Sequence, residues 1–244
     1  MNSDLKRTLR ALAVAGLVAS VFAAPIWAQA ATPAAKEEPN TIMWFLGAIG
    51  WVGIIQLIQS IVVFAMVIEH FVNVKREKFA PPEVIEEIEV LFEEGNYQEA
   101  LEFCEQHDVA FARIVAAGIQ KIGHSFEVIE KSVEEMEDEE AIKLGQKVGW
   151  LGVHAAVAPM LGLLGTVTGM VGAFDTIASA GETVKPADFA DDISQALLTT
   201  VIGLVIAIPI SAFYVYFKNR ATKIGLEMGA ICEELFDRFR AKQG

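Results

Sequence analysis

The sequence predicts an all-α membrane protein in which three long transmembrane helices extend into a helical cytoplasmic domain. Of its 244 residues 53% are hydrophobic, more than an ordinary soluble domain carries. Three apolar stretches are long enough to cross a bilayer as helices, which takes about 20 residues. The polar stretches repeat apolar residues at helical spacing, and none shows the alternation of a strand. The predicted spans are residues 42–68, 148–174 and 193–217.

Composition also limits the function. The net charge of −13 argues against nucleic-acid binding, which needs basic patches. The two cysteines, Cys104 and Cys232, have no metal or redox spacing, and we expect reduced, structural thiols. The spans contain no nucleophile–base pair, no paired aspartates and no metal-ligand set, so the sequence predicts neither an enzyme nor a cofactor.

The N-terminus has the pattern of a signal peptide over residues 1–30. A basic segment precedes a short apolar core, residues 11–24, and a small-x-small cleavage site follows at Ala28-Gln29-Ala30. The alternative is a permanent first span, but the apolar run is short and Pro25 interrupts it. Residues 31–41 are then expected to form a loose periplasmic tail.

The first span, residues 42–68, has Trp51 near its outer end, as interfacial aromatic residues do. Gln56 and Gln59 interrupt its apolarity, and we expect them to form hydrogen bonds between helices. By the positive-inside rule its far end is cytoplasmic, because basic residues follow it at Lys75, Arg76 and Lys78.

Residues 69–147 are expected to form a cytoplasmic helical domain. Helical periodicity runs through the whole stretch, with breaks at Pro81-Pro82, Gly95-Asn96 and Gly123-His124-Ser125. An acidic run at residues 134–140 is interpreted as a solvated face. The helix that carries this run is expected to continue without a break into the second span.

The second span, residues 148–174, has two unlike faces at helical spacing. One face is greasy. The other is built from small residues and one hydroxyl, which predicts close packing against a neighbouring helix and a border with a polar path. His154, near the inner end, is interpreted as an interfacial or packed residue rather than a proton relay. The small face comprises Ala155, Ala158, Gly162, Gly165, Thr166, Gly169, Gly172 and Ala173.

A short acidic segment, residues 175–192, is expected to form a periplasmic loop, and the third span follows at residues 193–217. Basic residues after the third span mark the cytoplasmic side again, and residues 218–244 are expected to form a helical cytoplasmic tail. Thr199 is placed one position off the small face of the third span. That face comprises Ala196, Thr200, Gly203, Ala207 and Ser211.

Threonines on the two small faces suggest a polar path without a proton carrier. Neither span has a carboxylate, Lys or Arg in its interior. A hydroxyl orders water but does not load and release protons near neutral pH, so a titrating group must come from another chain. The alternative is that Thr166, Thr199 and Thr200 only bond backbone carbonyls one turn back.

Two motifs resemble a known family. Residues 158–170 (APMLGLLGTVTGM) and residues 193–209 (ISQALLTTVIGLVIAIP) are similar to the second-span and third-span motifs of the MotA/TolQ/ExbB proton channel family. The chain most resembles ExbB, and the family's channel domain is expected over residues 110–230. MotA-type stators usually have four spans, which an uncleaved first segment would supply here.

The resemblance implies a bacterial inner-membrane protein with a periplasmic N-terminus and a cytoplasmic C-terminus. It implies a homopentamer whose second and third spans line a lumen, an ExbD-like single-span partner that carries an intramembrane Asp, and a TonB-like protein that the motor drives. A TolQ-like role in envelope maintenance and a non-conducting membrane scaffold remain alternatives.

The same resemblance assigns residues. Thr166 and Thr200 become lumen-lining threonines, and Gln195 stands where the family commonly has a glutamate, so any role of that carboxylate is absent here. The expected lining of the proton pathway is Thr166, Thr199, Thr200, Gln195 and Ser211. The expected helix-packing seam is Pro159, Gly162, Gly165, Gly169 and Gly203.

Overall fold

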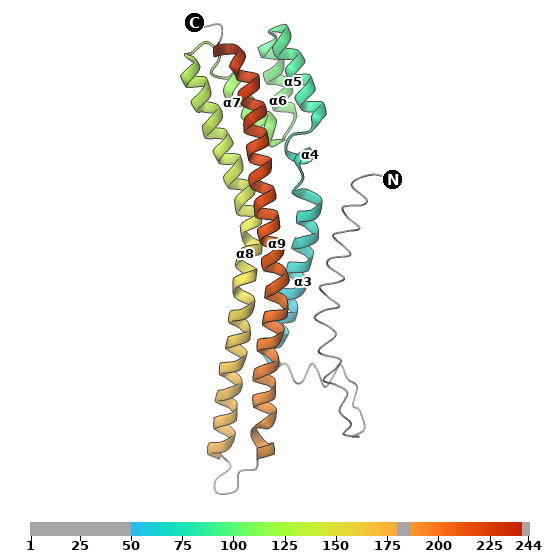
Figure 1. The fold of residues 1–244 in the computed structure, drawn as a ribbon, viewed down its shortest axis with the longest axis vertical. Coiled ribbons are helices and arrows are strands. Elements are labelled where there is room, and N and C mark those ends of the chain that lie inside the picture. Colours follow the sequence, from blue (N-terminus) through green and yellow to red (C-terminus); the bar gives the residue numbers. More distant parts are fainter. Residues whose placement is uncertain (1–49, 180–185, 241–244) are drawn as a thin grey trace, which may run out of the picture. The chain divides into compact units, whose positions relative to one another are not determined.

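The computed structural model describes residues 50–179 and 186–240 (Figure 1). Within these ranges the chain forms seven helices, and the only strand-like pairing is a single bridge between Ile122 and His124. The expected signal peptide (1–30), the periplasmic tail (31–41), the start of the first span and the last four residues lie outside the described residues. The predicted all-α class is confirmed.

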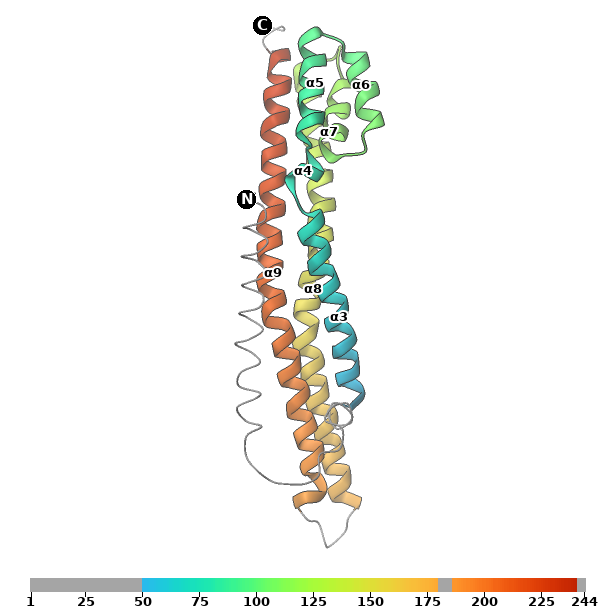
Figure 2. The ribbon, with the colours of Figure 1, turned by 90° about the vertical axis from the view of Figure 1, so that its right-hand side faces the viewer.

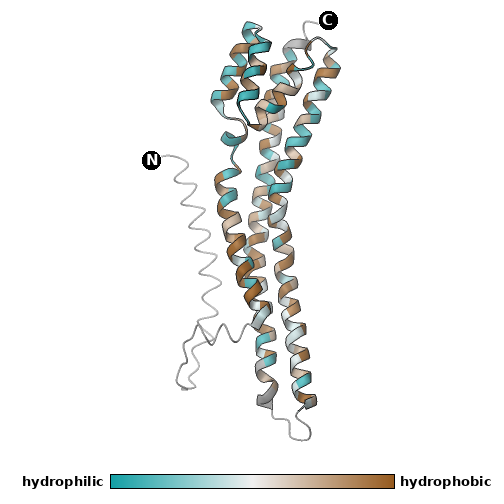
Figure 3. Cartoon of the chain, turned by 180° about the vertical axis from the view of Figure 1, so that it is seen from behind, coloured by the Kyte–Doolittle hydropathy of each residue, from teal (hydrophilic) through white to brown (hydrophobic). Residues whose placement is uncertain are grey.

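Three of the helices are long and apolar enough to cross a membrane, as predicted. They are α3 (Gly50–Asn73), α8 (Phe126–Ser179) and α9 (Pro186–Arg240). Figure 3 shows hydrophobic residues along α3 and along parts of α8 and α9, and a mixed pattern on the shorter helices. The helices do not stop where the apolar stretches stop. Helical backbone therefore reaches into both ends of residues 175–192 and into the C-terminal tail.

The contacts divide the chain into two compact units, and each is described by itself. The described part of the first, here called the span unit, consists of residues 50–60, 155–179 and 186–209. The second, here called the helical unit, consists of residues 61–154 and 210–240. α3, α8 and α9 each contribute to both units.

The helical unit adds four short helices: α4 (Arg76–Phe79), α5 (Pro82–Glu94), α6 (Tyr97–Gln106) and α7 (Ala110–Ile119). α5 begins with a proline at its first position, where the missing N–H is not needed. It ends at Gly95, which adopts φ +77° and so allows the left-handed cap that a side chain would strain. α5, α6 and α7 follow one another as a compact group (Figure 2).

The core of the helical unit forms around α7, where seven of the ten residues are buried. The ring of Phe236 in α9 packs on the bare backbone of Gly118, where a Cβ atom would lie 2.3 Å from the ring. Phe92 of α5 contacts the same ring edge to face, with centroids 5.6 Å apart. Deleting such a buried aromatic side chain typically costs about 3–5 kcal/mol.

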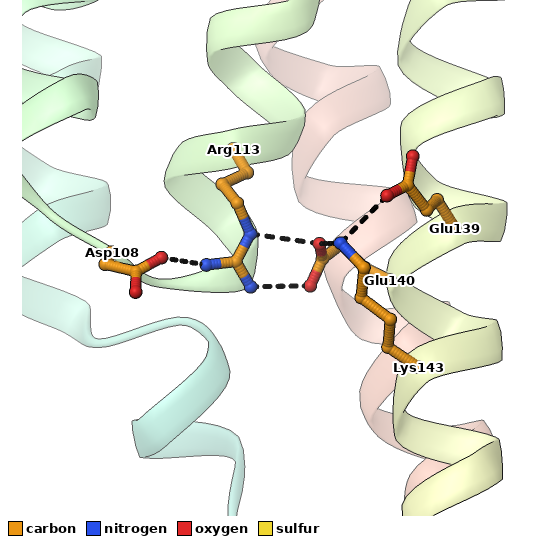
Figure 4. Close-up of polar contacts among 5 residues, drawn as sticks. All are labelled: Asp108, Arg113, Glu139, Glu140 and Lys143. Carbon is orange, nitrogen blue, oxygen red and sulfur yellow. Dashed lines mark hydrogen bonds and ion pairs between the residues drawn. The ribbon is translucent and has the colours of Figure 1, made fainter.

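Most carboxylates of the acidic run are exposed as predicted, but an ion-pair cluster in the helical unit corrects the prediction for its last residue, Glu140 (Figure 4). Glu140 is buried rather than solvated, and it accepts two hydrogen bonds from Arg113 of α7, at 2.9 Å and 2.6 Å. Lys143 donates a third at 2.8 Å, and Asp108 pairs with the other side of Arg113. Burial raises the pKa of Glu140, but the bonds from Arg113 and Lys143 outweigh it and hold the pKa below its usual value.

Both cysteines are free and buried in the helical unit. Burial raises the pKa of the Cys104 thiol to about 12. Burial also raises the pKa of Cys232, and the nearby Glu137 carboxylate adds to the effect. Both thiols therefore stay protonated, which makes them poor nucleophiles and fits the structural role expected for them.

Candidate polar pathway in the span unit

The small faces of α8 and α9 pack against each other in the span unit. Ala158, Gly162 and Gly165 are buried, while the large residues on the opposite side of α8 are exposed. A Cβ atom at Gly162 would lie 3.0 Å from the Cα atom of Thr200. A Cβ atom at Gly169 would lie 2.7 Å from the Cβ atom of Ala196. Such distances leave no room for a side chain, so glycine sets how closely the helices approach.

Backbone also meets backbone at Gly203. A Cβ atom there would lie 2.6 Å from the carbonyl oxygen of Ala158 and 3.2 Å from the Cα atom of Gly162. Neither of these atoms can move without shifting α8. Pro159, which the sequence assigned to the same seam, lies within α8 and is half-buried.

Thr166 and Thr200 meet across the seam. Their hydroxyl groups hydrogen-bond to each other, and each also lies within reach of Gly162 O and Ala196 O. Two hydroxyls carry only two protons, so they cannot make all of these bonds at once. The pair therefore has several interchangeable hydrogen-bond patterns. Both side chains are half-buried, so each is partly exposed on the span unit.

The alternative of bonding to backbone carbonyls is also visible. Thr166 and Thr200 reach the carbonyls four residues back at 3.2 Å and 3.5 Å. Thr199 donates to Ala196 O at 2.8 Å. Thr199 is not peripheral to the seam, contrary to its predicted position off the face. It is 1% exposed, and its hydroxyl would lie 2.2 Å from a Cβ atom at Gly165.

Gln56 of α3 was expected to bond between helices but was not assigned to the site. Its side chain is fully buried, and its Nε2 donates to Thr199 O at 2.9 Å. Among the described residues its Oε1 has no hydrogen-bond partner. The sequence signal was the polar break in an apolar span, but nothing in the sequence says which helix the amide meets.

Gln195 and Ser211 are the remaining predicted site residues, and no hydrogen bond between either of them and the threonine pair is seen among the described residues. Gln195 is half-buried and packs on Gly50, where a Cβ atom would lie 2.0 Å from its Nε2. Gly50 has φ +57°, which suits glycine in any case. Ser211 belongs to the helical unit, and its side chain is exposed.

The end of α8 at Ser179 and the start of α9 at Pro186 are here called the loop end. A second polar group lies toward this end, beyond Gln195. Thr176 donates to Asp192 Oδ2 at 3.3 Å. A cavity of about 110 Å³ lies beside it, lined by Gly50, Trp51, Val52, Gly165, Thr168, Gly169, Asp192, Gln195 and Thr199. Sequence reasoning missed Thr168 and Thr176. Their spacing from Gly165 and Gly172, three to four residues, was the available signal.

The site can order water and hydrogen bonds, and the threonine pair itself cannot store a proton near neutral pH. Among the side chains that the structure describes in the span unit, the charged ones are Asp175 and Asp192, and both lie toward the loop end. No group of three or more His, Cys, Asp or Glu that could hold a metal ion occurs in the part of the chain that the structure describes.

Comparison with known proteins places this geometry in context. The model of the MotA/TolQ/ExbB proton channel family matches residues 106–229. A biopolymer transport protein ExbB homologue of Methanothermobacter thermautotrophicus is 30% identical over 182 residues, 74% of this chain and 61% of that protein. The biopolymer transport protein ExbB of Salmonella typhimurium is 29% identical over 161 residues, 57% of this chain and 66% of that protein.

A more distant relative belongs to another system. The Tol-Pal system protein TolQ of Haemophilus influenzae is 34% identical over 91 residues, 37% of this chain and 40% of that protein. The chain thus spans about two thirds or less of the length of these relatives.

Proposed function

Because the chain belongs to the MotA/TolQ/ExbB proton channel family, we propose that it is the proton-channel subunit of an ExbB–ExbD-type motor in a bacterial inner membrane. The motor couples proton flow to TonB-dependent transport at the outer membrane. A homopentamer of this chain surrounds single-span, ExbD-like partners. The N-terminus and the loop end face the periplasm, and the C-terminus faces the cytoplasm.

The observation that carries the proposal is the threonine pair in a seam of small residues. Thr166 and Thr200 are bonded across two membrane-spanning helices and are half-buried, so a partner can reach them. The neighbours of Thr166 along α8, Gly165 and Val167, carry no charge. Two hydroxyl groups that can exchange hydrogen-bond partners can relay a proton. They cannot hold the proton near neutral pH. The partner's carboxylate supplies the missing proton carrier.

The ExbB relatives match a larger share of this chain than the TolQ relative does. The ExbB relatives match 57% to 74% of this chain, and the TolQ relative matches 37%. This breadth supports an ExbB-type role. A TolQ-type role would show itself through the partner, because a TolR-like protein would then replace the ExbD-like protein in co-purification.

The decisive variant is Thr200→Val, which keeps the shape of the side chain and removes the hydroxyl. Proton flux through vesicles that contain this chain and its ExbD-like partner should fall about tenfold, as expected when one favourable hydrogen bond of about 1.4 kcal/mol is lost from the rate-limiting passage. Thr222→Val is the matched control. Thr222 makes the same bond to a carbonyl four residues back on α9, but it is exposed in the helical unit. Equal flux in the two variants would contradict the proposal.

A further inference from the structure

The cavity at the loop end of the span unit has the properties of a hydrated pocket. Its volume of about 110 Å³ exceeds the roughly 30 Å³ that one water molecule occupies in the liquid. Polar side chains from two helices line it: Thr168 of α8, and Asp192, Gln195 and Thr199 of α9. A water molecule needs two to four polar partners to be held, and these side chains offer them.

Asp192 is the one charged side chain that lines this cavity. It is half-buried, and the hydroxyl of Thr176 donates to its Oδ2 at 3.3 Å. The carboxylate lies near α8 at Gly172, where an added Cβ atom would be in ordinary contact, 3.6 Å from Oδ1. A carboxylate has about four lone-pair sites, and one hydroxyl occupies one of them. The remaining sites are available to water in the cavity.

Within the described part of the chain, Gln56 carries an unpartnered polar atom close to the lining of the cavity, although Gln56 itself is buried and is not a lining residue. It lies one helical turn beyond Val52, a lining residue, and it bonds to the backbone of Thr199, another lining residue. Its Oε1 is fully buried and has no partner among the described residues. Leaving such an oxygen without any hydrogen bond costs about 1–3 kcal/mol, which a bound water removes.

We propose that this cavity is a hydrated proton-accepting pocket within each protomer, and that Asp192 is the carboxylate that binds the proton there. A proton passes from a hydronium ion in the periplasmic water to a carboxylate oxygen of Asp192. It then passes to cavity water and on to the carboxylate of the partner chain. Only O–H bonds form and break, and the charge moves with the proton. The inference rests on the proposed channel function and adds a site to it.

The test compares Asp192→Asn with Asp175→Asn in vesicles that hold the complex with its partner. Each variant removes one negative charge near the loop end, but Asp175 is exposed and does not line the cavity. Asp192→Asn should lower the proton flux about tenfold, and Asp175→Asn should leave it within about twofold, because only the former removes a proton-binding group from the path. Equal flux in the two variants overturns the inference.

A rescue separates proton binding from a purely structural role. Gln195 lies one turn along α9 from Asp192 and lines the same cavity. Adding Gln195→Glu to Asp192→Asn restores a carboxylate to the pocket and should recover most of the flux, even if Asp192→Asn alone weakens assembly. Failure of this double variant to recover flux overturns the inference. Absence of flux in the unsubstituted complex would instead refute the proposed function, so the two failures are distinguishable.

Discussion

Gly203 and Gly225 lie on the same helix, α9, in different surroundings. A Cβ atom at Gly203 would meet the carbonyl oxygen of Ala158 at 2.6 Å, whereas a Cβ atom at Gly225 would meet nothing within 4 Å. The first glycine is required by packing and the second is not. Both glycines lie in the same helix, so the contrast comes from their neighbours and not from the helical backbone.

Alanine at these two positions should therefore act in opposite directions. Gly203→Ala forces backbone apart and should lower the free energy of unfolding by about 1–3 kcal/mol. Gly225→Ala should leave it unchanged or raise it by up to about 1 kcal/mol, through helix propensity alone. Thermal unfolding of the purified protein in detergent, followed by circular dichroism, measures both. Equal midpoints for the two variants would show that the seam is looser than the structure has it.

At the scale of the elements, α7 is held to the part of α8 that precedes the predicted second span by the bonds from Arg113 to Glu140 (Figure 4). The Glu140 carboxylate is buried, and its pKa is held below the usual value. A depressed pKa stabilises the fold above the ordinary carboxyl pKa, and this stabilisation is lost as the pH falls through the folded-state value.

Replacing Glu140 with Gln should thus lower the free energy of unfolding at neutral pH, and the loss should be smaller in acid. At pH 7 the variant should lose about 2 kcal/mol of stability, since charge-assisted hydrogen bonds are removed. The difference from the unsubstituted protein should shrink as the pH falls below the ordinary carboxyl range and through the lowered pKa of Glu140. Glu135→Gln, at an exposed position that pairs only with Lys131 at 3.7 Å, is the control. A loss that is constant from pH 7 to pH 3 would refute this account.

At the scale of the molecule, apolar length and helical spacing were sufficient to predict the all-α class and, among the described residues, the three apolar helices long enough to cross a membrane. They also predicted that one unbroken helix enters the second span and that the C-terminal tail is helical. They did not predict how far α8 and α9 extend into residues 175–192, because a helix continues past the membrane boundary wherever its backbone bonds are satisfied. Spacing identified Thr166 and Thr200 on their own helices. It could not identify the carbonyl on another helix to which Gln56 donates, or the burial of Glu140, whose neutralising Arg113 is 27 residues away.

The central claim is that this chain supplies a path for protons and a partner supplies the carrier. Vesicles that contain this chain alone, the ExbD-like partner alone, or both together test it, with an imposed pH gradient and an internal pH dye. The account predicts proton flux only where both are present, and its loss when the partner's intramembrane Asp is replaced by Asn. Equal flux through this chain alone, or undiminished flux with the Asn partner, would contradict it.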